Sequence, residues 1–327
     1  MLQRIDLEKA IELICEGAGP LAPEETDVIS ANGRVLAEAI VSPADQPPFP
    51  RSPLDGYAFD AASCEGATKE RPAVLKVVEK LCAGDWSERT VGRGEAVKLM
   101  TGAMIPRGCN CVIMQEETDG GTDAVRVYKR LKPDENYCFA GEDYKKGDLL
   151  LPAFARIDPA AMAVIASAGL SRVRVIRRPR VSVISTGDEL TAPGTPRGNG
   201  KIYCSNNYYI EARLAEMGAD IAMSCVARDD AAELRSRIES AAAESDLIVS
   251  TGGVSVGEKD LVIRVLEEMG ADVVFHRIRI KPGSPAAFSR CRGVRLLSLS
   301  GNPFASAASL ELLARPLLAA MTGDRTL

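Results

Sequence analysis

Three short segments combine hydroxyl side chains with glycine directly after an apolar run typical of a buried strand. They are "STGDEL" (185–190), "STGGVSVG" (250–257) and "SGNP" (300–303). Glycine lacks a Cβ atom, so its backbone can approach an anion closely and can adopt positive φ. The free N–H groups of such loops, and of the helices that follow them, are donors for phosphate. The three loops therefore predict a pocket for a phosphorylated small molecule.

The recurrence of these loops matters more than any one of them. A single glycine pair more often serves a tight turn than a ligand, but turns at neighbouring strand ends can converge on one edge of a sheet. The turn "IKPGSP" (280–285) adds the cation Lys281 near that edge. Neither G-x-x-x-x-G-K-[ST] nor a helix-opening G-x-G-x-x-G occurs, so neither a Walker loop nor a dinucleotide fold is indicated. The candidate cofactor-binding residues are Thr251, Gly252, Gly253, Ser255, Gly257, Lys281, Ser284, Gly301 and Asn302.

Carboxylates flank the same loops. Glu189, Asp229 and Asp260 lie close to them in the sequence, and hard oxygen ligands near bound phosphates suit Mg²⁺. These three residues are the candidate metal ligands. Asp230 opens a predicted helix and is at least equally well explained as its N-cap. The single histidine, His276, lies in an apolar strand pattern, so neither a His/Cys zinc site nor a Ser-His-Asp triad is indicated.

The composition is that of an ordinary globular protein. The chain has 327 residues, of which 46% are hydrophobic and 26% charged, with a formal net charge of −5. Phosphate neutralisation needs surplus Lys and Arg, so general nucleic-acid binding is not expected, and the basic stretch 172–180 is interpreted as the solvated side of a strand. Nine cysteines without a spacing pattern, and no signal peptide, indicate reduced thiols in a cytoplasmic protein. No apolar run approaches 18 residues, so no membrane span is expected.

Hydropathy patterns predict the elements that must position the loops. Segment 1–19 predicts an amphipathic helix, and helical structure is expected over 6–40. Five prolines within 43–53 mark a boundary, and residues 54–137 predict short strands and turns. From Pro179 onwards, strand and helix patterns alternate. This alternation is typical of an α/β fold with a mostly parallel sheet and flanking helices.

Eight blocks carry a family resemblance. They are "SPLDGYAF", "LMTGAMIPRGCNCVIMQEE", "GEDYKKGD", "VSVISTGDEL", "IYCSNN", "DLIVSTGGVSVGEKD", "IKPGSPAAF" and "SGNPFASAASLELLARPLL". Together, and in this order, they resemble the molybdopterin molybdenumtransferase family, the MoeA and gephyrin E-domain group. Because the blocks run through most of the chain, they are far more specific than one glycine loop.

The resemblance implies both an architecture and a reaction. The implied domains are an α/β molybdopterin-binding domain over 178–327, an elongated helical and β N-terminal domain over 1–44 and 138–177, and an inserted β-rich domain over 45–137. A homodimer would take adenylylated molybdopterin, cleave the adenylate with Mg²⁺ present and insert molybdate, with the molybdopterin adenylyltransferase as a further partner. Asp143 lies in the matching "GED" block. The catalytic residues carried over by this resemblance are Asp55, Thr101, Glu189 and Asp260.

The sequence also departs from the family pattern. Ser284 stands where a second lysine is common, "LSGNP" replaces Leu-Pro-Gly-Asn-Pro, and "RSPLDGYA" replaces an Asn-Ser-Ala-Met-like run before Asp55. The family normally continues with another C-terminal β domain, so a short form that lacks this domain is expected. These departures leave open a carrier or sensor that binds molybdopterin without turnover. A gephyrin-like scaffold is a weaker alternative, because a scaffold need not keep carboxylates around a phosphate pocket.

Overall fold

The computed structural model describes residues 1–254, 261–324 and 326. The chain forms two compact units. The large unit comprises Met1–Ala39 and Leu151–Leu327, and the small unit comprises Ile40–Leu150. The family resemblance implies three domains, and their boundaries are not tested by this division into two units.

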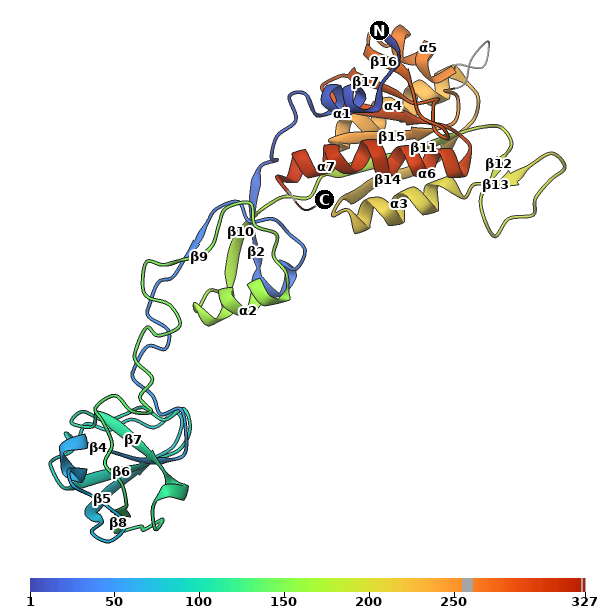
Figure 1. Ribbon diagram of the computed structural model, residues 1–327. Helices are drawn as coiled ribbons and strands as arrows, with labels where there is room; N and C mark the ends of the chain where they lie inside the picture. Colours follow the sequence, from blue (N-terminus) through green and yellow to red (C-terminus); the bar gives the residue numbers. More distant parts are fainter. Residues whose placement is uncertain (255–260, 325, 327) are drawn as a thin grey trace. The chain divides into compact units, whose positions relative to one another are not determined.

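A mixed sheet forms the centre of the large unit (Figure 1). Its described strands, in spatial order, are β1 (Leu2–Ile5), β16 (Asp272–Ile278), β17 (Ala287–Cys291), β18 (Val294–Leu299), β15 (Leu247–Thr251), β11 (Arg180–Thr186) and β14 (Asp220–Ala227). β17 is antiparallel to both of its neighbours, and the other pairs in the sheet are parallel. The sheet is thus mostly parallel, as predicted, with an antiparallel strand, β17, that the sequence analysis did not identify.

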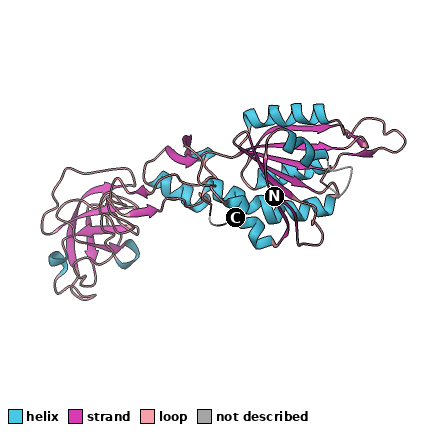
Figure 2. Cartoon of the chain, turned by 90° about the horizontal axis from the view of Figure 1, so that it is seen from above, coloured by secondary structure: helices cyan, strands magenta, loops and turns pink. Residues whose placement is uncertain are grey.

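Helices cover both faces of this sheet (Figure 2). The helices of the large unit are α1 (Leu7–Cys15), α2 (Pro159–Ser167), α3 (Asn206–Glu216), α4 (Ala231–Glu244), α5 (Leu261–Glu268), α6 (Pro303–Ser309) and α7 (Arg315–Thr322). Alternate strand residues point to opposite faces. Val249 packs in a core cluster with α1, α3, α7 and the π-helix Leu310–Ala314, whereas its neighbour Ile248 packs in a second cluster with α4 and α5. This two-sided burial explains why the strands read as continuous apolar runs.

The prediction of a helical N-terminal segment was wrong outside α1 and the short 3-10 helix Val28–Ser30. Residues Leu2–Ile5 form β1, which adds to the sheet edge beside β16. Gly17, with φ +65°, and Pro20 follow α1 and prevent its continuation. The segment Pro23–Asp27 then forms β2, which pairs antiparallel with β10 (Arg172–Ile176). Pairing with a distant partner therefore overrode the local helical pattern.

Aspartate side chains cap the starts of two helices, and one of them is the predicted cap Asp230. Asp158 accepts a hydrogen bond from the Ala161 N–H at 2.7 Å at the start of α2, and Asp230 accepts one from the Glu233 N–H at 2.8 Å at the start of α4. Ser205 occupies the N-cap position of α3 but makes no side-chain cap. These caps fix where the helices begin after the strand-end loops.

The C-terminal helical segment is longer and more apolar than the sequence analysis expected. The sequence predicts a bend or end near Pro316, but α7 continues through it after a π-helix at Leu310–Ala314. Among helices of the described residues, Pro303–Thr322 is long and apolar enough to cross a membrane by length and composition, and half of it is buried inside the protein. Its residues Leu313 and Leu317 belong to the core of the large unit. A segment of spanning length therefore does exist, and it packs as a core helix.

The small unit contains a five-stranded sheet in the order β7-β4-β6-β5-β8. Its strands are β4 (Gly56–Phe59), β5 (Ala73–Leu81), β6 (Glu95–Leu99), β7 (Cys111–Met114) and β8 (Ala124–Val127). Tyr57 and Phe59 are buried on one face, and Ala58 is buried on the other. Short strands elsewhere are β3 (Ile40–Val41), β9 (Leu149–Leu151), β12 (Leu190–Thr191) and β13 (Ile202–Tyr203). The short strands predicted over 54–137 are therefore present.

The basic stretch 172–180 is held in ion pairs. Arg172 lies 3.4 Å from Glu25, and Arg178 lies 3.3 Å from Asp220. Arg177 donates from both terminal nitrogens to the Asp246 carboxylate, each at 2.7 Å. This pairing supports the interpretation of the stretch as the charged side of a strand.

We expect Asp246→Asn to lower the free energy of unfolding by about 1–3 kcal/mol at pH 7. Burial alone would raise the pKa of Asp246, but hydrogen bonds from Arg177 and from the Arg180 N–H lower it below its usual value. A lowered native pKa stabilises the fold above the unfolded value of about 3.9, and this stabilisation is lost as pH falls through the native pKa. Urea unfolding at pH 7 and pH 3 should therefore show a difference between variant and wild type that shrinks in acid.

Asp220→Asn is the matched control. The Asp220 side chain is 59% exposed and pairs with Arg178, whereas the Asp246 side chain is 19% exposed. Exposed ion pairs contribute about 0–1 kcal/mol, so the control should change stability little. Equal effects of the two substitutions would contradict a stabilising role for the partly buried pair of Asp246 and Arg177.

Candidate functional site

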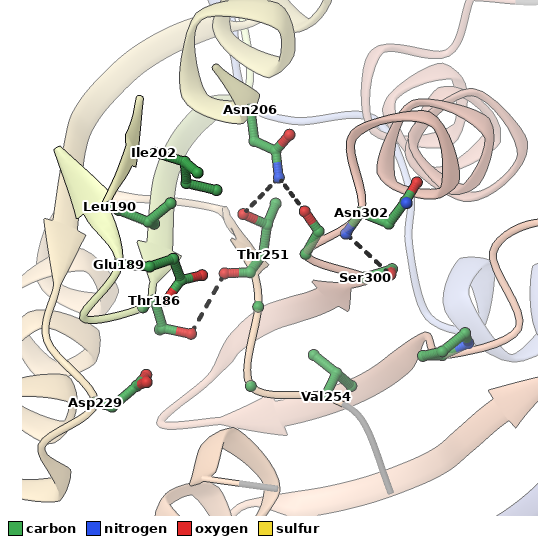
Figure 3. Close-up of a pocket in the computed structure, with 15 residues that line it drawn as sticks. Thr186, Glu189, Leu190, Ile202, Asn206, Asp229, Thr251, Val254, Ser300 and Asn302 are labelled. Carbon is green, nitrogen blue, oxygen red and sulfur yellow. Dashed lines mark hydrogen bonds between the residues drawn. The ribbon is translucent and has the colours of Figure 1, made fainter. Parts of the chain in front are cut away.

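The three predicted loops meet around one cavity of about 500 Å³ (Figure 3). The cavity lies at the carboxyl ends of β11, β15 and β18. Its lining comes mainly from residues 186–190, 251–254 and 300–302. Carboxyl ends of parallel strands lie at the same edge of a sheet, which is where ligands bind in open α/β folds. The predicted convergence of the loops is confirmed.

Glycine is required where these loops touch one another. Gly252 has φ +88°, and a Cβ atom there would lie 2.4 Å from the carbonyl oxygen of Thr186. A Cβ atom on Gly301 would lie 3.4 Å from the Cα of Gly252. The Gly252 N–H donates to the Leu299 carbonyl at 3.2 Å, which joins the second loop to the strand before the third. The loops therefore pack backbone against backbone, with little room for side chains between them.

Asn302 begins helix α6 at the edge of the cavity. Its side-chain oxygen accepts a hydrogen bond from the Ala305 N–H at 3.1 Å, and Pro303 follows in the first turn. The Asn302 N–H donates to the Ser300 hydroxyl at 3.3 Å. Asn302 thus lines the cavity, as predicted, and also caps the helix.

Thr251 lines the cavity but is 1% exposed. Its hydroxyl lies 2.8 Å from the Ser185 hydroxyl and 3.5 Å from the amide nitrogen of Asn206. Both partners belong to the protein. The Thr251 side chain therefore contributes to the floor of the cavity through contacts with neighbouring elements.

Two of the three candidate metal ligands reach the cavity. Glu189 and Asp229 both line it (Figure 3). The Asp229 N–H donates to the Asp188 carboxylate at 3.2 Å, which ties the end of β14 to the first loop. Asp260 lies outside the described residues, and among those described no group of three His, Cys, Asp or Glu side chains could hold a metal ion. Two carboxylates beside a phosphate pocket suit Mg²⁺, which commonly takes one or two protein carboxylates plus substrate oxygens.

The remaining predicted cofactor-binding residues fall in two groups. Ser255 and Gly257 lie outside the described residues. Lys281 and Ser284 are not among the described residues that line the cavity, although Pro285 of the same turn is. A Cβ atom on Gly283 would lie 2.4 Å from the Ser309 hydroxyl, so this turn packs closely on α6.

Asp55 and Thr101 meet in the small unit, whereas the cavity belongs to the large unit. One Asp55 carboxylate oxygen accepts from the Thr101 N–H at 2.7 Å and from the Thr101 hydroxyl at 2.8 Å. These bonds lower the pKa of Asp55, so it is ionised at neutral pH. Asp143 lies 3.8 Å from Arg51 in the same unit.

The candidate residues named from the sequence did not include Leu190, Ile202 and Asn206, which also line the cavity. Leu190 and Ile202 face each other across the short pair β12 and β13 and form an apolar wall. Asn206 is the first residue of α3, and its amide reaches two of the loops (Figure 3). The signal for Asn206 was its place in "IYCSNN", at the start of a helix that follows the first loop.

Histidine and cysteine take no part in the cavity among the described residues that line it. His276 is 6% exposed on β16, and its Nε2 lies 3.5 Å from the Val254 carbonyl oxygen. All nine cysteines are free thiols, and burial raises the pKa of Cys109 to about 12. A buried thiol with so high a pKa is a poor nucleophile.

The fold and the cavity define the class of α/β proteins that bind an anionic small molecule at the ends of their strands. A mostly parallel sheet ends in backbone turns that can surround a phosphate, and carboxylates and an apolar wall lie beside them. This arrangement suits an anionic small molecule with a flat apolar part.

Comparison with known proteins identifies the family within that class. Residues 5–169 match the family model for the MoeA N-terminal region (domain I and II), and residues 182–320 match the probable molybdopterin binding domain. The molybdopterin molybdenumtransferase of Haemophilus influenzae is 35% identical over 307 residues, 94% of this chain and 74% of the relative. That of Staphylococcus aureus is 34% identical over 319 residues, 98% of this chain and 76% of the relative.

A solved structure supports the same family. The molybdopterin biosynthesis MoeA protein from Pyrococcus horikosii superposes with a TM-score of 0.88 at 34% identity, covering 98% of this chain and 80% of that one. The chain belongs to the molybdopterin molybdenumtransferase family, a family of transferases of molybdenum cofactor biosynthesis. The resemblance inferred from eight sequence blocks is confirmed.

Proposed function

We propose that this protein inserts molybdate into adenylylated molybdopterin and releases AMP. The observation that carries the proposal is the convergence of three glycine turns on one cavity of about 500 Å³, with carboxylates at its rim. In this reading the N–H groups of Gly253 and Gly301 bind the phosphate of the pterin, whereas the Gly252 N–H, already donated to the Leu299 carbonyl, holds the turn. Lys281 adds positive charge from the neighbouring turn, and the wall of Leu190 and Ile202 contacts the ring.

The carboxylates suggest how the adenylate is cleaved. Glu189 and Asp229, together with Asp260, would hold Mg²⁺ beside the phosphates. Such an ion neutralises charge on the phosphoanhydride and on the leaving AMP. By holding that ion, Glu189 would keep the anhydride against the glycine turns, where water would supply the oxygen that replaces the broken anhydride bond and AMP would leave. No covalent nucleophile is needed, which fits the lack of a usable His or Cys among the cavity residues described.

Other assignments rest on the family. We keep Asp55 and Thr101 as proposed catalytic residues, because their paired geometry holds an ionised carboxylate in place. Asp143 is proposed to act with them. A homodimer, a cytoplasmic location and transfer of substrate from the molybdopterin adenylyltransferase are proposed on the same grounds.

The test is a single-turnover assay. The purified chain is mixed with adenylylated molybdopterin, Mg²⁺ and molybdate, and AMP and incorporated molybdenum are measured together. Release of AMP in step with molybdenum incorporation supports the proposal. Tight binding without AMP release would instead support a carrier or sensor, the function favoured by Ser284 in place of a second lysine. Absence of both binding and turnover would contradict each reading.

A further inference from the structure

The side chain of Asn206 joins two of the loops that form the cavity. Its amide nitrogen donates to the Gly301 carbonyl oxygen at 3.0 Å and points to the Thr251 hydroxyl at 3.5 Å (Figure 3). The two contacts span 95 and 45 residues of sequence. Asn206 therefore ties the start of α3 to the ends of β15 and β18 at once.

The orientation of the Asn206 amide follows from its partners. A backbone carbonyl can only accept, so the group facing Gly301 must be the NH₂. The second hydrogen of that NH₂ is directed at Thr251, whose oxygen must then accept. A side chain at this position needs donors in two directions, which asparagine supplies and a carboxylate does not.

The neighbouring residue Asn207 fixes the direction of the Thr251 hydroxyl. The Asn207 amide nitrogen donates to the Cys225 carbonyl at 3.0 Å, so its oxygen faces Ser185 and accepts the Ser185 hydroxyl. The Ser185 hydroxyl has a single proton, and this proton is donated to the Asn207 side-chain oxygen. In the 2.8 Å contact between Ser185 and Thr251, Thr251 is consequently the donor.

This chain of bonds has a consequence for ligand binding. Because its proton is directed inward to Ser185, the Thr251 hydroxyl presents a lone pair to Asn206 and has no proton for an anion. Anion binding must then come from the N–H groups of the turns, whose spacing becomes decisive.

We propose that Asn206 is a positioning residue that holds the Gly252 and Gly301 turns at the spacing an anion requires. The two turns already approach closely, since a Cβ atom on Gly301 would be 3.4 Å from the Gly252 Cα. Among the residues that the structure describes, the Gly252 N–H also donates to the Leu299 carbonyl at this point. The identity of the ligand rests on the proposed function, but the role of Asn206 in the free protein does not.

The test is Asn206→Asp, which preserves shape and removes the donors. In ligand-free protein at pH 7, hydrogen exchange in peptides covering 247–254 and 295–304 should be at least about fivefold faster than in wild type. Affinity for adenylylated molybdopterin, measured by calorimetry without molybdate, should fall about tenfold, and KM should rise more than kcat falls. Because a protonated carboxyl can donate one hydrogen bond to Gly301, the affinity ratio of variant to wild type should recover as the pH is lowered towards 4.5.

Asn136→Asp is the matched control. Asn136 also donates from its amide to a backbone carbonyl, that of Val112 at 2.9 Å, but it lies in the small unit. This control should leave exchange in 247–254 and 295–304 unchanged. The inference is overturned if Asn206→Asp behaves like wild type in exchange and affinity, or if the control loosens the turns equally. The two proposals can fail separately. If the wild type never releases AMP but Asn206→Asp still speeds hydrogen exchange in the turns, the proposed function is refuted and the role of Asn206 stands.

Discussion

Gly252→Ala is expected to lower the affinity for adenylylated molybdopterin at least about 30-fold, equivalent to about 2 kcal/mol. Gly252 has φ +88°, and the added Cβ atom would lie 2.4 Å from the Thr186 carbonyl oxygen. Neither atom belongs to a flexible side chain, so the turn itself must move. Such a movement displaces the N–H groups of two loops from the anion. Calorimetric titration of variant and wild type measures the loss directly.

Gly218→Ala is the control that separates backbone strain from the loss of affinity. Gly218 has a similar φ of +86°, but a Cβ atom there would meet nothing within 4 Å. Both variants should lose about 1–2 kcal/mol of stability from left-handed backbone strain. Only Gly252→Ala should also lose affinity. If the two variants bind equally well, close backbone approach is not what the glycine provides.

Glu189→Gln is expected to reduce Mg²⁺-dependent AMP release at least about 100-fold, which corresponds to about 2.7 kcal/mol in the activation barrier. The substitution keeps size and polarity but removes the negative charge that a hard cation needs. Glu189 lines the cavity with Asp229, so this charge lies where the phosphates would be held. Binding of the pterin by the glycine turns should change less than threefold. Raising Mg²⁺ should restore part of the rate.

The control for charge alone is Glu244→Gln, at the end of α4 and exposed. It should leave AMP release and its Mg²⁺ dependence unchanged. Undiminished turnover in Glu189→Gln would remove Glu189 from the mechanism. A loss of pterin affinity as large as the loss of rate would assign Glu189 to binding instead.

The α/β part of the fold could be predicted because its strands are buried on both sides. Alternate residues such as Ile248 and Val249 both need apolar side chains, so the strand reads as an unbroken run. Strand β1 could not be found this way, because its first residues are exposed and only pairing with β16 defines it. The same holds for β2, whose charged sequence becomes a strand through its partner β10.

The part of the site that follows from the order of parallel strands could be predicted. Loops that follow parallel strands must meet at one edge, and this placed Gly252 and Gly301 together from sequence alone. Asn206 could not be placed, because its contacts depend on where α3 docks on the sheet. Nor could the wall of Leu190 and Ile202, which is created by a pair of two-residue strands. Long-range docking leaves no periodic pattern in the sequence.

We propose that main-chain N–H groups at neighbouring strand ends bind the anion. Amide NMR of ¹⁵N-labelled protein, titrated with adenylylated molybdopterin in the absence of molybdate, tests it most directly. We expect the Gly253 and Gly301 signals to show the largest shifts and to share one dissociation constant. If the Gly253 and Gly301 signals stay in place at saturation while signals from Ile40–Leu150 move, the ligand binds elsewhere and main-chain binding at the strand ends is contradicted.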